Sequence, residues 1–255
     1  MYAELVSRNG GLISKETQAK IHGTRIGIAG CGMGSLIAET LCRLGVGKFV
    51  LADLDRVEVV NFNHQPYDNR HIGQQKVDAL SMRLSEINSE ASIRVLRDFI
   101  SPNNAQNFIA ECDIVVDGID PMPSLIPSLA LARTCRQERK AFFYPIDIGY
   151  GAILFSFLPD GKTFESALEV PDNMTFNQFS KVPPWKLLMA LVKNLNIPSK
   201  YLRIIHKVLE GKLAHYPQPI TASLCASALV AMAIVKMAQG KPIPFVSKFD
   251  PISMG

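Results

Sequence analysis

The run Ile26-Gly27-Ile28-Ala29-Gly30-Cys31-Gly32-Met33-Gly34-Ser35 predicts a short buried strand followed by a glycine-rich turn. Residues Leu36 to Leu44 are apolar at helical spacing, so a helix is expected directly after the turn. Glycines at 30, 32 and 34 let the backbone come close to a phosphate, and the start of a helix offers free N–H groups at its positive dipole end. The run therefore predicts an anion-binding turn between a strand and a helix.

A second strand is predicted at Lys48-Phe49-Val50-Leu51-Ala52, because Gly45-Val46-Gly47 ends the helix before it. Asp53 follows this strand, about 20 residues beyond the glycines, where dinucleotide-binding folds place a carboxylate on the ribose hydroxyls. Up to Asp53 the pattern would also fit an NAD-dependent oxidoreductase.

The motifs that follow Asp53 narrow the choice. They are Asp53-Leu54-Asp55-Arg56-Val57, Asn61-Phe62-Asn63-His64-Gln65, Gly73-Gln74-Gln75-Lys76 and, at a strand end, Asp117-Gly118-Ile119-Asp120. With the glycine turn, these motifs make the chain similar to the ThiF/MoeB/HesA adenylyltransferases of the ubiquitin-activating-enzyme-like superfamily, over at least residues 7–158. The resemblance disfavours an NAD-dependent oxidoreductase.

The resemblance implies an ATP-dependent adenylyltransferase that activates a carboxylate, with ATP and Mg²⁺ as cofactors. It implies phosphate contacts for Asn63, Gln65 and Lys76, ribose contacts for Asp53, and Mg²⁺ binding for Asp120. In such relatives an arginine ahead of the first strand enters the active site of the other subunit, and Arg8 occupies the matching position. The full set of candidate nucleotide-binding residues is Gly30, Gly32, Gly34, Asp53, Asp55, Asn63, His64, Gln65 and Lys76, and the candidate catalytic residues are Arg8, Lys76 and Asp120.

Two features depart from the family pattern. The glycine turn is one residue shorter than usual and carries Cys31, and His64 stands where relatives have an arginine that contacts the nucleotide phosphates. A histidine with an ordinary pKa of about 6.5 is mostly neutral at pH 7, whereas arginine offers phosphate oxygens a planar fork that is always charged. A non-catalytic relative that binds a nucleotide or a partner therefore stays open beside the enzyme.

The rest of the chain predicts a Rossmann-like, doubly wound α/β fold. A mostly parallel sheet with helices on both faces is expected, and the tail 242–250 is expected to pack as an edge strand. The chain of 255 residues is interpreted as a single domain. Its expected parts are an N-terminal arm and helix at 1–24, a nucleotide-binding core at 25–158, a helical insertion on the substrate side at 160–219, and a closing helix and tail at 220–255.

Composition limits the functional classes. The net charge of +4 is mild and no run of basic residues occurs, so the charge indicates no polyanion partner, although tRNA stays open. The five cysteines form no Cys-x-x-Cys pair, which is typical of reduced thiols in a cytoplasmic protein. No cysteine lies between Cys135 and Cys225, so covalent thioester or persulfide transfer is not expected. The apolar run 224–235 is shorter than the roughly 18 residues of a membrane span, so a buried helix and no membrane partner are expected.

The acceptor of the adenylyl group is left open by the sequence. A ubiquitin-like or sulfur-carrier protein, a small carboxylic acid, and a tRNA base carrying a carboxylate that is then dehydrated are all compatible with the motifs. The protein is expected to be a homodimer, because Arg8 is expected to act across a subunit boundary.

Overall fold

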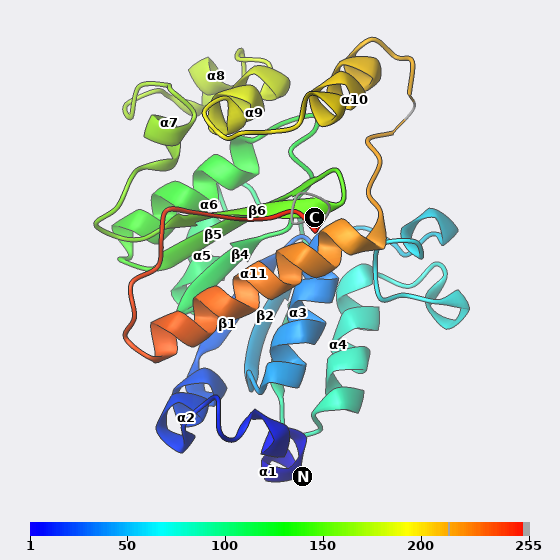
Figure 1. Cartoon of the computed structure of the whole chain (residues 1–255), viewed down its shortest axis with the longest axis vertical. Coiled ribbons are helices and arrows are strands. Elements are labelled where there is room, and N and C mark those ends of the chain that lie inside the picture. The colour runs from blue at the N-terminus through cyan, green and yellow to red at the C-terminus, as the bar shows by residue number, and fades with distance from the viewer. Residues whose placement is uncertain (214, 252–255) are drawn as a thin grey trace.

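The computed structural model describes residues 1–213 and 215–251, and within them a seven-stranded sheet forms the centre of the fold (Figure 1). The strand order is β3-β2-β1-β4-β5-β6-β7; the strands β1 to β5 are parallel, and β6 and β7 are antiparallel to their neighbours. The predicted fold class is confirmed. The strands are β1 (Arg25–Ala29), β2 (Lys48–Ala52), β3 (Ser92–Leu96), β4 (Ile114–Asp117), β5 (Ala141–Ile148), β6 (Gly151–Phe157) and β7 (Val246–Phe249).

Helices cover both faces of the sheet, as Figure 1 shows. Neighbouring residues of a strand point to opposite faces, so Val116 and Phe143 join one core while Val115 and Phe142 join the other. The first core lies under α3 (Met33–Leu44), α4 (Lys76–Ile87) and α11 (Ile220–Ala238); the second lies under α5 (Ala105–Ala110) and α6 (Ile126–Gln137).

The strand order reverses between β1 and β4. The helix after β1 packs on one face and the helix before β4 on the other, so the chain leaves these two neighbouring strands in opposite directions. Ligands of open α/β sheets bind at such a point, beyond the carboxyl ends of the strands. We call this side the carboxyl edge, and the side where β1 to β5 begin the amino edge.

Four helices follow β6 in the predicted insertion and lie together at the top of Figure 1. The sequence predicted a helical insertion over 160–219, but α7 and α8 were missed because four residues are too few to show a helical period. Each of these short helices starts at a threonine that caps it, Thr163 and Thr175, and buries a phenylalanine. The helices are α7 (Phe164–Ala167), α8 (Phe176–Phe179), α9 (Pro184–Val192) and α10 (Ser199–Leu209).

The two ends of the chain pack against the central unit. By length and composition α11 could cross a membrane, with a mean hydropathy of 1.9 over 18 residues, but half of that window is buried and the helix packs on α3 and β6. The predicted buried helix and the predicted edge strand, β7, are confirmed. At the other end, α1 (Tyr2–Leu5) precedes α2 (Lys15–Gly23), which Ser14 caps as expected. That residues 1–255 form a single domain stays a prediction.

Candidate functional site

The glycine turn between β1 and α3 lies against the end of β4. Gly30 has a φ of +86°, and a Cβ atom there would lie 2.6 Å from the backbone of Gly118. A Cβ on Gly118 would in turn lie 2.6 Å from the Gly30 carbonyl oxygen, so neither position has room for a side chain. Gly32 caps α3 without a side-chain hydrogen bond, which leaves the first N–H groups of that helix available to a ligand.

Asp53 ties the glycine turn to the end of β2. Its Oδ2 accepts a hydrogen bond of 2.6 Å from the Cys31 N–H, and its Oδ1 accepts one of 2.8 Å from the Asp55 N–H. The carboxylate is buried, so its two backbone hydrogen bonds hold the turn in place. The sequence predicted this residue at the ribose but not its contact with the turn.

Lys76 is the first residue of α4 and is also buried. Its Nζ lies 3.1 Å from Oδ2 of Asp55, whose side chain is 55% exposed. A cavity of about 240 Å³ opens beside this pair and is lined by Asp55, Arg56, Glu58, Asn61 and Lys76. An ammonium group held by an exposed carboxylate can exchange that partner for a phosphate without being left unpaired.

The side chains of Asn63, His64 and Gln65 form a short hydrogen-bonded row. Asn63 Oδ1 can only accept, so the 2.6 Å contact with His64 Nδ1 places the ring proton on that nitrogen. His64 Nε2 then accepts from Gln65 Nε2 at 2.9 Å, and the imidazole is neutral. Burial lowers the pKa of His64, and the charge of Lys76 lowers it further. Gln65 Nε2 also faces Gly32, 3.5 Å from where a Cβ atom would lie, so the row adjoins the glycine turn.

Tyr67 is a site residue that the sequence analysis missed. Its buried hydroxyl lies 2.8 Å from the Cys31 carbonyl oxygen and 3.2 Å from that of Lys76, and so links the glycine turn to the start of α4. The signal available in the sequence was a tyrosine two residues after Gln65 in a polar motif, because a buried tyrosine hydroxyl needs a partner.

The end of β4 carries two carboxylates with different surroundings. Asp117 is 1% exposed, and burial raises its pKa to about 7. Its Oδ1 accepts from the Ile119 N–H at 2.9 Å, which shapes the loop, and a hydrogen bond with the Ser128 side chain opposes part of the pKa shift caused by burial. Asp120 is exposed and accepts from the Met122 N–H at 2.9 Å. The loop therefore presents Asp120 to solvent beside the glycine turn.

Asp147, near the end of β5, is a second residue that the sequence analysis missed. It is 7% exposed and its Oδ2 accepts a 3.0 Å hydrogen bond from the Ser223 hydroxyl of α11. Burial raises the pKa of Asp147 to about 6, and the hydrogen bond from Ser223 opposes that shift. A carboxylate close behind the predicted strand 141–145 was a signal for the carboxyl edge.

Arg8 lies at the other end of the fold. It is exposed in the turn Ser7–Asn9, and the neighbouring Asn9 donates a hydrogen bond to the carbonyl oxygen of Leu44, at the end of α3. Since α3 has 12 residues, the helix spans about 18 Å from the glycine turn to this point. Arg8 therefore does not join the other candidates within one chain, and its role across a subunit boundary stays a prediction.

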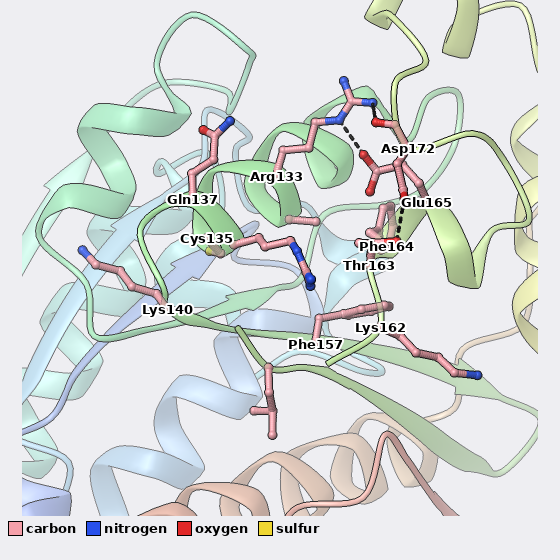
Figure 2. A pocket seen from close by; sticks show the side chains of 13 residues that line it. Arg133, Cys135, Gln137, Lys140, Phe157, Lys162, Thr163, Phe164, Glu165 and Asp172 are labelled. Carbon is pink, nitrogen blue, oxygen red and sulfur yellow. Dashed lines mark hydrogen bonds and ion pairs between the residues drawn. The ribbon is translucent and has the colours of Figure 1, made fainter. Parts of the chain in front are cut away.

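A cavity of about 650 Å³ lies away from these residues, between α6, the end of β6 and α7 (Figure 2). Both of its arginines have partners: Arg133 Nε lies 2.6 Å from Glu165 Oε1, and Arg136 donates to the Gly161 carbonyl oxygen at 2.9 Å. All five cysteines are buried and free, and burial raises the pKa of each of their thiols.

The amino-acid sequence matches the ThiF family over residues 6–254. The chain belongs to the ThiF family. It is 35% identical over 114 residues to the tRNA threonylcarbamoyladenosine dehydratase of Haemophilus influenzae, and 37% identical over 110 residues to the Escherichia coli enzyme of that name. These alignments cover 44% and 42% of this chain and 44% and 40% of the relatives, so the matched region spans less than half the length of either enzyme.

Solved structures show the same fold over a longer span. The crystal structure of E. coli TcdA, a tRNA N6-threonylcarbamoyladenosine dehydratase, superposes with a TM-score of 0.65 at 21% identity, covering 93% of this chain and 95% of that one. The E. coli MccB structure with ATP gives 0.65 at 16% identity and covers 92% and 66%. At these identities the likeness shows the fold alone.

Proposed function

We propose that this ThiF-family protein is an ATP-dependent adenylyltransferase that activates a carboxylate. A carboxylate oxygen of the acceptor attacks the α-phosphorus of ATP, a P–O bond forms, and the bond to the β-phosphate breaks as pyrophosphate leaves with the electron pair. Such a reaction needs positioning and neutralisation of charge rather than a nucleophilic side chain. The convergence of the glycine turn, the open start of α3 and the buried Lys76 at the carboxyl edge is the observation that carries this proposal.

Each candidate residue has a defined task in this reaction. The glycine turn and the N–H groups of α3 bind the phosphates. Lys76 leaves Asp55 to contact the phosphates, as Asn63 and Gln65 also do. Asp53 accepts hydrogen bonds from the ribose hydroxyls through the lone pairs that its backbone contacts leave free.

Asp120 is the residue that we expect to hold Mg²⁺. Its exposed carboxylate offers the hard oxygen ligand that Mg²⁺ prefers, and Oδ2 has no hydrogen-bond partner among the described residues. The described residues contain no group of three or more metal-ligating side chains, which fits a cation bound by one carboxylate together with substrate phosphates. Bound Mg²⁺ would supply charge neutralisation at the phosphates.

A carboxylate on a modified tRNA base is our first candidate acceptor, because the named curated relatives and the TcdA structure are tRNA threonylcarbamoyladenosine dehydratases. A ubiquitin-like protein is the second. The support for it is a 36% identical match over 120 residues to the ubiquitin-like modifier-activating enzyme 5 of Caenorhabditis elegans, covering 43% of this chain and 28% of that enzyme.

Pyrophosphate exchange tests the proposed reaction. Labelled pyrophosphate should enter ATP only when an acceptor is present, and the assay should compare tRNA carrying threonylcarbamoyladenosine, the same tRNA without it, ubiquitin-like proteins and small acids. Calorimetric titration with ATP and Mg²⁺, NAD⁺ and NADP⁺ is the matching binding test. Tighter binding of either dinucleotide than of ATP would contradict adenylation, and ATP binding without exchange by any acceptor would favour the non-catalytic reading.

We further propose a cytoplasmic homodimer in which Arg8 of one subunit completes the site of the other. Within one chain Arg8 lies at the amino edge, so a role for it at the carboxyl edge requires a second chain. Mixing an Arg8→Ala chain with an Asp120→Ala chain should restore part of the activity, because heterodimers contain one intact site. A monomer in light scattering at micromolar concentration would exclude it.

A further inference from the structure

The cavity beside Lys76 is lined, within the described part of the chain, by polar side chains. It has a volume of about 240 Å³ and is bounded by Asp55, Arg56, Glu58, Asn61 and Lys76. Sites for drug-sized ligands are larger, roughly 300–1,000 Å³, and mostly apolar. These lining side chains offer an adenine ring no apolar surface. The cavity therefore fits a charged fragment of a ligand, such as the terminal phosphates of a nucleotide.

The charged groups of this cavity differ in how they are paired. Lys76 Nζ lies 3.1 Å from the carboxylate of Asp55, and the carboxylate of Glu58 accepts a hydrogen bond from the Asn61 N–H. Arg56 is exposed and forms no ion pair with a carboxylate among the described residues. Arg56 is therefore the cation of this cavity that can bind an added anion without giving up a carboxylate partner.

The backbone holds Arg56 next to the start of α4. Arg56 forms an isolated antiparallel β-bridge with Gln75, the residue directly before Lys76. Its Nη1 also donates a hydrogen bond of 2.6 Å to the Gly73 carbonyl oxygen. A guanidinium carries five N–H donors in a planar fork, so the bond to Gly73 leaves most of them free. Arg56 can therefore bind phosphate oxygens while its contact with Gly73 stays in place.

The charge of a triphosphate requires more than one cation at the carboxyl edge. Among the candidate residues of one chain, Lys76 supplies a positive charge there, whereas His64 is neutral and Arg8 lies at the amino edge. Neutralising the charge on the phosphates is the main task of such a site. A second cation in the same cavity as Lys76 would share that task.

We propose that Arg56 binds the β- and γ-phosphates of ATP in the cavity that it shares with Lys76. The inference rests on the proposed function and adds to it a phosphate-binding residue outside the candidate set. The planar fork of a guanidinium can donate to two phosphate oxygens at once. The pyrophosphate that leaves in the reaction is then held by two cations, and AMP, which lacks both of these phosphates, does not reach Arg56.

Calorimetric titration of the full chain with ATP and with AMP, both in the presence of Mg²⁺, tests this inference. Arg56→Ala should weaken ATP binding by about tenfold or more and leave AMP binding within about twofold of the wild type. Arg70→Ala is the matched control. Arg70 is an exposed arginine of the same loop between β2 and α4, but it pairs with Asp68 at 2.7 Å and does not line the cavity, so this variant should bind both nucleotides normally.

Three further variants separate the charge of Arg56 from its contact with Gly73. Arg56→Gln keeps an N–H donor for the Gly73 carbonyl oxygen but has no charge, so it should lose ATP affinity as the alanine variant does. Arg56→Lys keeps the charge without the fork and should retain part of the affinity. Glu58→Gln keeps an oxygen for the Asn61 N–H and removes a negative charge from the cavity, so it should bind ATP more tightly than the wild type.

Three results would overturn the inference. The first is normal ATP binding by Arg56→Ala, and the second is an equal loss of ATP and AMP in that variant. The third is normal ATP binding by Arg56→Gln, which would limit Arg56 to holding the loop through Gly73. Each of these leaves the proposed function standing, whereas a wild type that binds no ATP would contradict the proposed function and the inference together.

Discussion

The larger cavity and the carboxyl edge differ in how their polar groups are paired, although the amino edge away from that cavity also has buried atoms without a partner, such as His22 Nδ1 and Asn88 Nδ2. The amino edge has the cavity of about 650 Å³, and none of the polar side chains that line it is buried without a partner in the described part of the chain. The carboxyl edge has a smaller cavity beside Lys76, of about 240 Å³. Three buried polar atoms at this edge have no hydrogen-bond partner among the described residues: Gln65 Oε1, Asp147 Oδ1 and Tyr201 Oη.

This difference shows that volume alone does not mark a binding site. In the larger cavity Arg133 is already paired with Glu165, and Arg136 and Lys140 already donate to backbone carbonyl oxygens (Figure 2). At the carboxyl edge a ligand would supply hydrogen bonds that the protein lacks, which is a net gain rather than an exchange. Matched substitutions at the two edges therefore test this difference.

The largest difference is expected between Gly118→Ala and Gly161→Ala. A methyl group on Gly118 would lie 2.6 Å from the Gly30 oxygen and 2.8 Å from the Gly34 nitrogen, so the glycine turn must move. We expect ATP binding to weaken by about a hundredfold or more, with overpacking costing roughly 1–3 kcal/mol of stability. Gly161, beside the larger cavity, has its nearest neighbour at 3.3 Å, and its alanine variant should bind ATP normally. Calorimetry measures the ATP affinity of each variant, and thermal unfolding measures its stability. Equal ATP affinities of the two variants would contradict the proposed position of the phosphates.

A smaller difference is expected between two lysines. Lys76→Ala should weaken ATP binding about tenfold to a hundredfold, because a charge-assisted hydrogen bond contributes about 1.5–3 kcal/mol. Lys162→Ala removes an ammonium at the amino edge, 5.0 Å from the Phe245 ring centre, and should leave ATP affinity unchanged. If the Lys162 variant alone lost affinity, the nucleotide would have to bind in the larger cavity.

Asp147→Asn should change stability with pH. The folded protein holds this proton up to about pH 6, while the unfolded chain releases it near pH 4, so the carboxyl lowers the free energy of unfolding as pH rises between these values. The free energy of unfolding of the variant, relative to that of the wild type, should therefore rise by about 1–3 kcal/mol from pH 4 to pH 7. Urea unfolding at each pH measures the difference, and a gain that is constant across the range would refute the buried charge.

Glu165→Gln is the counterpart of that variant at the amino edge. It removes the carboxylate from a pair with Arg133 in which Glu165 is buried. The guanidinium would then lack its carboxylate partner, so the substitution should lower the free energy of unfolding at pH 7, opposite in sign to Asp147→Asn. The same urea titrations measure the free energy of unfolding of both variants. A higher free energy of unfolding in Glu165→Gln than in the wild type would contradict the difference between the two edges.

The smallest effect is expected at His64. Bound phosphates favour the imidazolium, so the pKa of His64 should be higher in the complex than in the free protein, where burial holds it below its usual range. Affinity should then be greatest at low pH and fall, by about tenfold at most between pH 6 and 8, as pH rises through the pKa of the complex. Charging the ring requires Gln65 to turn its unpartnered Oε1 toward Nε2.

His64→Arg is the control for that titration. Arginine stays charged over the whole range, so the variant should bind ATP with no histidine-linked pH dependence and more tightly than the wild type at pH 8. Titration of the buffer and of ATP itself contributes equally to both proteins. If the two proteins show the same pH profile, His64 does not contact the phosphates.

Local patterns predicted most of the fold. The glycine turn, the first two strands and the helix between them were predicted to within a few residues, because turn chemistry and apolar period act over neighbouring positions. The motifs from Asp53 to Asp120 indicated the family of the chain, and all the candidate residues except Arg8 lie at strand ends, in loops or at helix starts at the carboxyl edge. The two four-residue helices were missed, although their threonine caps are visible in the sequence.

Contacts between distant residues were decided only by the tertiary structure. Ser223 and Asp147 are 76 positions apart, and Tyr67 reaches Cys31 across 36, so no local pattern links them. The neutral state of His64 likewise depends on burial and on Lys76, which the packing of α4 supplies. The sequence by itself determined the elements and the chemistry available at the carboxyl edge, because both reside in short runs of residues. Which polar groups are left buried and unpartnered there was determined by how β5, α10 and α11 pack together, because burial is a property of the whole fold.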